Sequence, residues 1–175
     1  MQEYNLLTML LTPHVLTGLA IAYKVPYPWL SLPIAMISHQ FLDLIPHDDF
    51  GTKGENGLMD NGKARLFVNG TLRLNWRHAI IFGDALLALS ATIFFAIKFN
   101  NPLLYFAAAG LSIWSDILRA PYFLLGWKKK FFRIAHEIDY ERCHNQEKGA
   151  WGKAVQIAVA IVALAILFNS FPWLD

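Results

Sequence analysis

The sequence predicts a single-domain, all-α integral membrane protein with about five transmembrane helices, and three observations lead to this fold class. Hydrophobic residues make up 55% of the 175 residues, and the mean hydropathy is +0.36. Charged residues make up only 16%, whereas a soluble domain usually contains about 25%. Five apolar segments are each about 19 to 25 residues long, and about 20 residues suffice to cross the hydrocarbon of a bilayer.

The five predicted spans follow one another along a single domain of residues 1–175. Pro28 and Pro102 stand at predicted helix starts, where a missing backbone N–H costs little. Asn101 precedes Pro102 in a pattern typical of a tight turn between the third and fourth spans. The predicted spans cover residues 5–23, 28–46, 77–98, 102–126 and 151–172.

Two longer connections are polar. The first, residues 47–76, contains two short β-prone runs on either side of Asn69-Gly70, which predicts a β-hairpin with a type I′ turn. The second, residues 127–150, has apolar residues at helical spacing, which predicts an amphipathic helix at the cytoplasmic membrane surface. That apolar stripe consists of Phe131, Ile134, Ala135 and Ile138.

Lysine and arginine predict the orientation in a cell inner or plasma membrane. Both polar connections are rich in these residues, whereas the opposite face of the predicted bundle has only Lys24 and Lys98. Positive residues stay in the cytoplasm, so we expect the N-terminus and both connections there and the C-terminus outside. The net charge of +2 gives no case for a nucleic-acid partner, and the single Cys143 excludes an internal disulfide.

Ionisable residues interrupt the apolar spans. Inserting one such residue in the middle of a membrane helix costs roughly 2.5 to 3.5 kcal/mol of free energy. Several of them together therefore indicate a shared polar site. Four predicted helices place such residues in the cytoplasmic half, at depths of roughly 6 to 15 Å by helix rise. These residues are His14, His39, Asp43, Asp84 and Asp116.

Histidine with aspartate is metal-ligand chemistry. His39, Asp43 and His47 recur at i, i+4 and i+8, so they share one face of the second predicted helix. A solvated helix end suits His47 equally well, and His78 fits an interfacial anchor beside Trp76. The predicted ligands of a divalent metal, zinc by preference, are His14, His39, Asp43, His47 and His78.

Two carboxylates and one guanidinium complete the predicted catalytic set. Asp84 or Asp116 is expected to act as general base. Arg119, three residues after Asp116, either neutralises that aspartate in a structural ion pair or binds an anionic substrate group. His136, Asp139 and His144 of the amphipathic segment share one face, which either caps the site or faces solvent.

Three short motifs give the chain a family resemblance. The segments are His14-Val-Leu-Thr-Gly18, Leu42-Asp43-Leu-Ile-Pro46-His47-Asp48 and Trp114-Ser115-Asp116. With these the chain resembles the predicted membrane-bound metal-dependent hydrolases of bacteria and archaea, a YdjM-like family regulated by LexA in some hosts. This chain has Ser115 where a histidine is expected. The resemblance implies metal-dependent hydrolysis by the His and Asp residues.

The sequence therefore predicts a metal-dependent hydrolase whose partners are membrane lipids. Its substrate is expected to be a lipid or another amphiphile, with or without a phosphate group, reached from the cytoplasmic side. A small transporter or proton-coupled carrier is one alternative, because membrane-buried Asp and His also relay protons. A non-enzymatic assembly protein with a structural polar cluster is another.

Overall fold

The computed structural model describes residues 10–45, 67–68, 71–72, 74, 76–123, 125, 130–131 and 150–169. Strands β1 (Phe67–Val68) and β2 (Thr71–Leu72) pair antiparallel, with Phe67 opposite Leu72. The helical fold class and the pairing of the short hairpin are therefore confirmed. The helices are α1 (Leu11–Lys24), α2 (Pro28–Leu44), α3 (Trp76–Lys98), α4 (Pro102–Ser112), α5 (Trp114–Phe123) and α7 (Ala150–Phe168).

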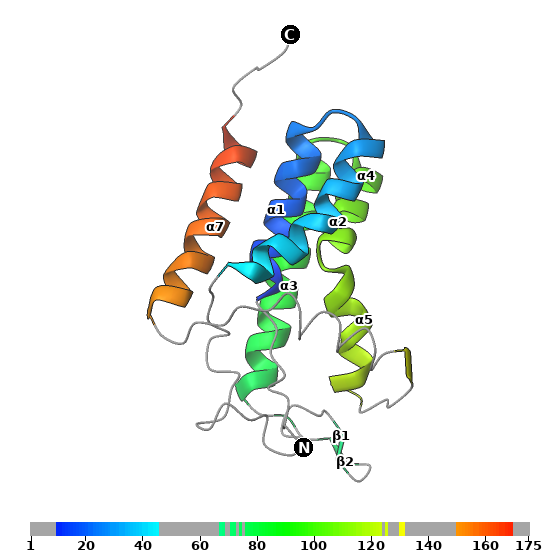
Figure 1. Ribbon diagram of the computed structural model, residues 1–175, viewed down its shortest axis with the longest axis vertical. Helices are drawn as coiled ribbons and strands as arrows, with labels where there is room; N and C mark the ends of the chain where they lie inside the picture. The colour runs from blue at the N-terminus through cyan, green and yellow to red at the C-terminus, as the bar shows by residue number, and fades with distance from the viewer. Residues whose placement is uncertain are drawn as a thin grey trace.

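Helix α1 lies at the centre of the bundle and contacts α2, α3, α4 and α7 (Figure 1). Figure 1 shows α7 on one side of α1, and α2 and α4 on the other. Leu19 of α1, Ala108 of α4 and Leu167 of α7 are fully buried. Polar residues on α1 are therefore held in the interior, between several other helices.

Helices α1 and α4 pack almost backbone to backbone at Gly18. A Cβ atom added there would lie 2.7 Å from Ser112 Cβ and 2.9 Å from the Ala108 carbonyl oxygen. Small residues allow this approach in helical bundles, because no side chain separates the two backbones. The contact places His14, one turn before Gly18, next to the C-terminal end of α4.

The prediction of one helix over residues 102–126 is wrong. Helix α4 begins after Asn101, whose side chain accepts a hydrogen bond from Leu104 N, and it ends at Ser112. Ile113 has φ −126° and ψ 18°, outside helical geometry, and α5 begins at the next residue. The hydroxyl of Ser112 donates to the Ala109 carbonyl at 2.8 Å, a local bond that competes with regular helix. The break leaves backbone groups at two new helix ends inside the bundle.

Large apolar side chains cover much of the outer surface. Trp29, Leu86 and Ile97 are 73%, 64% and 74% exposed. Two helices of the described part, His78–Lys98 and Trp151–Phe168, are long and apolar enough to cross a membrane. Helices α1 and α2 have 14 and 17 residues within the described part. The structure thus supports membrane association, and five spans remain a prediction.

Two predicted features lie outside the described residues. The first is the turn at Asn69-Gly70, so the turn type of the hairpin stays a prediction. The second is the amphipathic helix of residues 127–150, of which only Lys130, Phe131 and Ala150 are described.

Candidate metal centre

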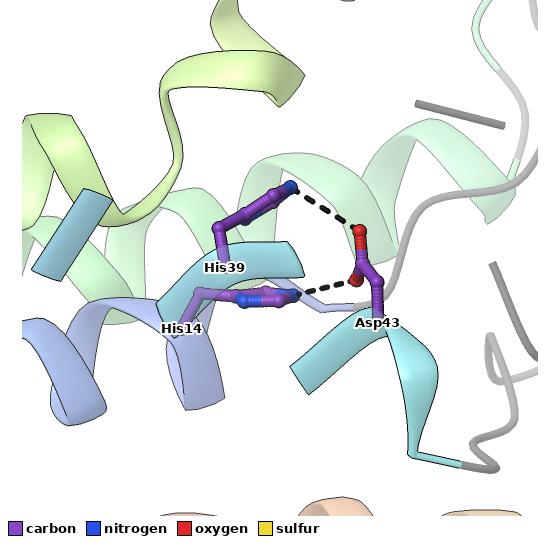
Figure 2. Close-up of side chains that lie close together, drawn as sticks. All are labelled: His14, His39 and Asp43. Atoms are coloured by element: carbon purple, nitrogen blue, oxygen red, sulfur yellow. Dashed lines mark ion pairs between the residues drawn. The ribbon is translucent and has the colours of Figure 1, made fainter. Parts of the chain in front are cut away.

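The centre consists of His14 from α1 and His39 and Asp43 from α2 (Figure 2). His14 Nε2 lies 3.2 Å from Asp43 Oδ1, and His39 Nε2 lies 3.3 Å from Asp43 Oδ2. The carboxylate therefore faces both imidazoles, one oxygen to each, as Figure 2 shows. The two rings lie beside each other, with centroids 4.3 Å apart. All three side chains are buried, with at most 1% exposure.

This group can hold a metal ion. One ligand atom from each residue lies within 4.8 Å of the other two. In a tetrahedral zinc site with bonds near 2.1 Å, neighbouring ligand atoms stand about 3.4 Å apart. The nitrogen-to-oxygen distances of 3.2 and 3.3 Å approach that spacing, each to a different oxygen of Asp43, so one oxygen must move toward both imidazoles for the carboxylate to bind through a single atom. The donor set of two imidazoles and one carboxylate also matches the chemistry of catalytic zinc sites.

The spacing of His39 and Asp43 follows from α2 itself. Residues four apart lie on the same face of a helix, one turn above the other. His14 joins them through tertiary packing, because α1 runs beside α2 and brings its fourth residue to the level of Asp43. His14 lies near the start of α1 and Asp43 near the end of α2, so the centre sits toward one end of both helices.

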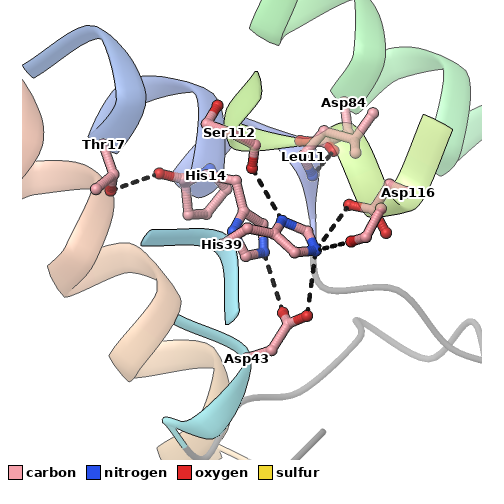
Figure 3. A network of polar contacts seen from close by, with 10 residues as sticks. Leu11, His14, Thr17, His39, Asp43, Asp84, Ser112 and Asp116 are labelled. Atoms are coloured by element: carbon pink, nitrogen blue, oxygen red, sulfur yellow. Dashed lines mark hydrogen bonds and ion pairs between the residues drawn. The ribbon is translucent and has the colours of Figure 1, made fainter. Parts of the chain in front are cut away.

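The break between α4 and α5 orients the His39 ring. His39 Nδ1 donates to the carbonyl oxygen of Ser112, the last residue of α4, at 2.9 Å (Figure 3). A carbonyl oxygen only accepts, so Nδ1 carries a proton. The other ring nitrogen, Nε2, is the one that faces Asp43. A carbonyl partner of this kind is the usual support of a metal-bound histidine.

Helix α5 adds two polar groups beside the same nitrogen. The Ser115 hydroxyl contacts His39 Nε2, and Asp116 Oδ2 lies 4.0 Å from it. Ser115 and Asp116 are both buried. Figure 3 shows His39 between Ser112, Asp116 and Asp43. Asp116, predicted from the sequence as a catalytic residue, is therefore brought next to the centre as a second carboxylate.

Asp84 has a different position from the one its spacing suggested. Its carboxylate accepts hydrogen bonds from the backbone N–H groups of Leu11 and Thr12 and from the Thr12 hydroxyl. The Thr12 hydroxyl also lies 3.2 Å from the Asp84 carbonyl oxygen. The first N–H groups of a helix have no partner within the helix, so Asp84 acts as an N-terminal cap of α1 supplied by α3.

The remaining predicted site residues either lie outside this converging group or fall outside the described part of the chain. His78 of α3 is buried, with 1% exposure, but it is not among the three residues whose ligand atoms converge. His47 lies outside the described residues, as do the side chain of Arg119 and all of His136, Asp139 and His144. Their predicted roles remain predictions.

Sequence reasoning gave Ser112 and Ser115 no role at the site. The signal was present: Ser112, Ser115 and Asp116 fall at i, i+3 and i+4, a polar face in an apolar stretch. The carbonyl contact of Ser112 could not have been found, because it arises from the helix break and not from the side chain.

Comparison of the chain with protein-family models, with curated protein sequences and with solved structures found no match. The family resemblance of its three motifs is therefore untested.

Proposed function

We propose that this chain is a membrane-embedded metal-dependent hydrolase that acts on a lipid-like or other amphiphilic substrate from the cytoplasmic side. One observation carries the proposal. The Asp43 carboxylate lies 3.2 Å from His14 Nε2 and 3.3 Å from His39 Nε2, and all three side chains are buried. Two imidazoles and one carboxylate that converge in this way form a donor set for a divalent cation.

Zinc suits this donor set best. Imidazole nitrogens suit zinc, copper, iron and nickel, whereas calcium and magnesium prefer oxygen ligands throughout. Two histidines and one carboxylate are also the donor set of known catalytic zinc sites. A bound divalent ion would supply a Lewis acid and a water acidic enough to be deprotonated near neutral pH.

The residues of the chain itself have separate proposed roles in binding and catalysis. His14, His39 and Asp43 would hold the ion, and the Ser112 carbonyl accepts from His39 Nδ1, which leaves Nε2 as the nitrogen that would bind it. We assign the general base to Asp116, because its carboxylate lies beside His39 whereas the Asp84 carboxylate is engaged with the N-terminus of α1. Arg119, one turn after Asp116, is proposed to bind an anionic substrate group such as a phosphate.

The polarity of the molecule supports the membrane setting. Its outer surface presents many large apolar side chains, an extent of exposed apolar surface that is unusual in a soluble monomer, and its interior holds histidine and aspartate beside an apolar core. Exposed Tyr27 and Trp29 follow Lys24 at the α1–α2 connection. Such residues gather where a membrane meets water. We propose five spans, with the metal centre at the basic, cytoplasmic end.

Metal analysis of detergent-purified protein tests the centre. We expect about one zinc per chain in the wild type and its loss in a His39→Ala, Asp43→Ala double variant. His78→Ala is the matched control, because this histidine is equally buried but lies outside the converging group. Circular dichroism and gel filtration establish that each variant is folded. A metal-free wild type, or a folded double variant that keeps its metal, contradicts the assignment.

Activity requires a separate measurement. The purified protein is incubated with a total lipid extract, and mass spectrometry follows chelator-sensitive formation of cleaved products. We expect the products to disappear in the double variant and in Asp116→Asn. Substrate flux in proteoliposomes without cleavage would favour a carrier instead. A double variant that fully supports the host cell would favour an assembly protein with a structural polar cluster.

A further inference from the structure

An apolar groove runs between α1, α2 and α7, on the side of α1 facing α7. Its volume is about 580 Å³, within the range of about 300 to 1,000 Å³ that is typical of small-molecule sites. Among the described residues of its lining, Thr17 and Lys24 are polar and every other side chain is aliphatic. This part of the groove therefore suits an alkyl chain, with Lys24 as its charged group.

The groove has the length of a lipid chain. Along α7 its lining extends from Val155 to Ile166, which is about 16 to 17 Å at the rise of an α-helix. The hydrocarbon core of a bilayer is about 30 Å thick, so the chains of one leaflet occupy about 15 Å. One acyl chain lying parallel to α7 would fill the groove from end to end.

The charge lies at the end where a headgroup belongs. Lys24 is exposed, stands in the last turn of α1 and precedes the exposed aromatic residues Tyr27 and Trp29. Aromatic residues of this kind mark the headgroup level of a membrane. Both lysines at this end lie over an aromatic ring: the Lys24 ammonium is 5.1 Å from the Tyr23 ring centroid, and the Lys98 ammonium is 4.4 Å from that of Phe168. Lys98 also donates to the Leu167 carbonyl at 3.5 Å, whereas Lys24 lines the groove.

We propose that this groove binds an anionic phospholipid, with an acyl chain along α7 and the phosphate at Lys24. The proposal rests on the membrane setting of the proposed function but not on the metal. Lys24 lies ten residues after His14 on α1, which is about 15 Å along the helix. The headgroup is therefore far from the metal centre, and this lipid is a bound partner and not the substrate.

Native mass spectrometry of delipidated protein tests the site. The protein is incubated with an equimolar mixture of phosphatidylglycerol and phosphatidylcholine, and the retained lipids are counted. Lys24→Gln removes the charge, and Lys98→Gln is its control at the same end. Ala158→Phe fills the groove from an exposed lining position, and Ala165→Phe adds the same side chain at an exposed position of α7 outside the lining.

We expect wild type to retain about five phosphatidylglycerol molecules for each phosphatidylcholine, the preference that one lysine near a membrane surface provides. Lys24→Gln should reduce this ratio to about one, and Ala158→Phe should reduce retention of both lipids. The two controls should behave as wild type. A wild type without preference, or an Ala158→Phe variant that retains lipid normally, overturns the proposal. Zinc measured in the same samples separates failure of the lipid site from failure of the metal centre.

Discussion

Replacing Gly18 by alanine tests how the packing of α1 on α4 supports the metal centre. The new Cβ would lie 2.7 Å from Ser112 Cβ, about 0.7 Å short of the 3.4 Å at which ordinary contact begins. It would also lie 2.9 Å from the Ala108 carbonyl oxygen, which belongs to the backbone and cannot rotate away. The two helices must therefore separate, and overpacking of this kind costs about 1 to 3 kcal/mol.

Gly110→Ala is the matched control. Within the described part of the chain, a Cβ at Gly110 meets nothing within 4 Å, so this variant gains the helix propensity of alanine without a clash there. Gly18→Ala gains the same propensity, about 1 kcal/mol, so the difference between the two variants isolates the clash. Thermal unfolding in detergent should place Gly18→Ala below Gly110→Ala by about 2 to 4 °C for each kcal/mol.

The same variant should weaken the metal centre. Ser112, which the new Cβ would displace, supplies the carbonyl that orients His39. A site of this kind tolerates displacements of about 0.5 Å, and loss of such supporting contacts typically reduces metal affinity about 10- to 100-fold. Competition with a chromogenic zinc chelator measures the affinity. If Gly18→Ala is as stable as Gly110→Ala and binds zinc equally well, the reasoning is refuted.

Three further predictions follow from single residues. Asp84→Asn should reduce stability by about 0.5 to 2 kcal/mol in thermal unfolding, because the cap of α1 is weakened, and should leave the zinc content unchanged; loss of zinc would instead make Asp84 a ligand. Ser115→Ala should bind zinc about fivefold more tightly, because the Ser115 hydroxyl no longer competes with the metal for His39 Nε2. Competition with a chelator measures this affinity, and weaker binding would make Ser115 a ligand. Cys143, the single cysteine, should react with a membrane-impermeant maleimide in inverted vesicles but not in intact cells; the opposite pattern reverses the topology.

Local patterns in the sequence predicted most of the helices. Helices α2 and α3 begin and end within two residues of the predicted spans, because apolar length and proline positions are local properties. The division of the predicted span 102–126 was missed. Its apolar run continues through Ile113, and the break accompanies local bonding of Ser112 and its contact with α2.

The sequence by itself determined that His39 and Asp43 share a helix face, because residues four apart always do in an α-helix. It also determined that buried carboxylates on other spans need partners, because hydrocarbon does not solvate charge. Only the tertiary structure decided which partners they have. Packing of α1 against α2 and α4 brought His14 to Asp43, and packing against α3 directed Asp84 to the start of α1. These contacts join residues far apart in the chain, and no periodicity encodes the side on which two helices meet.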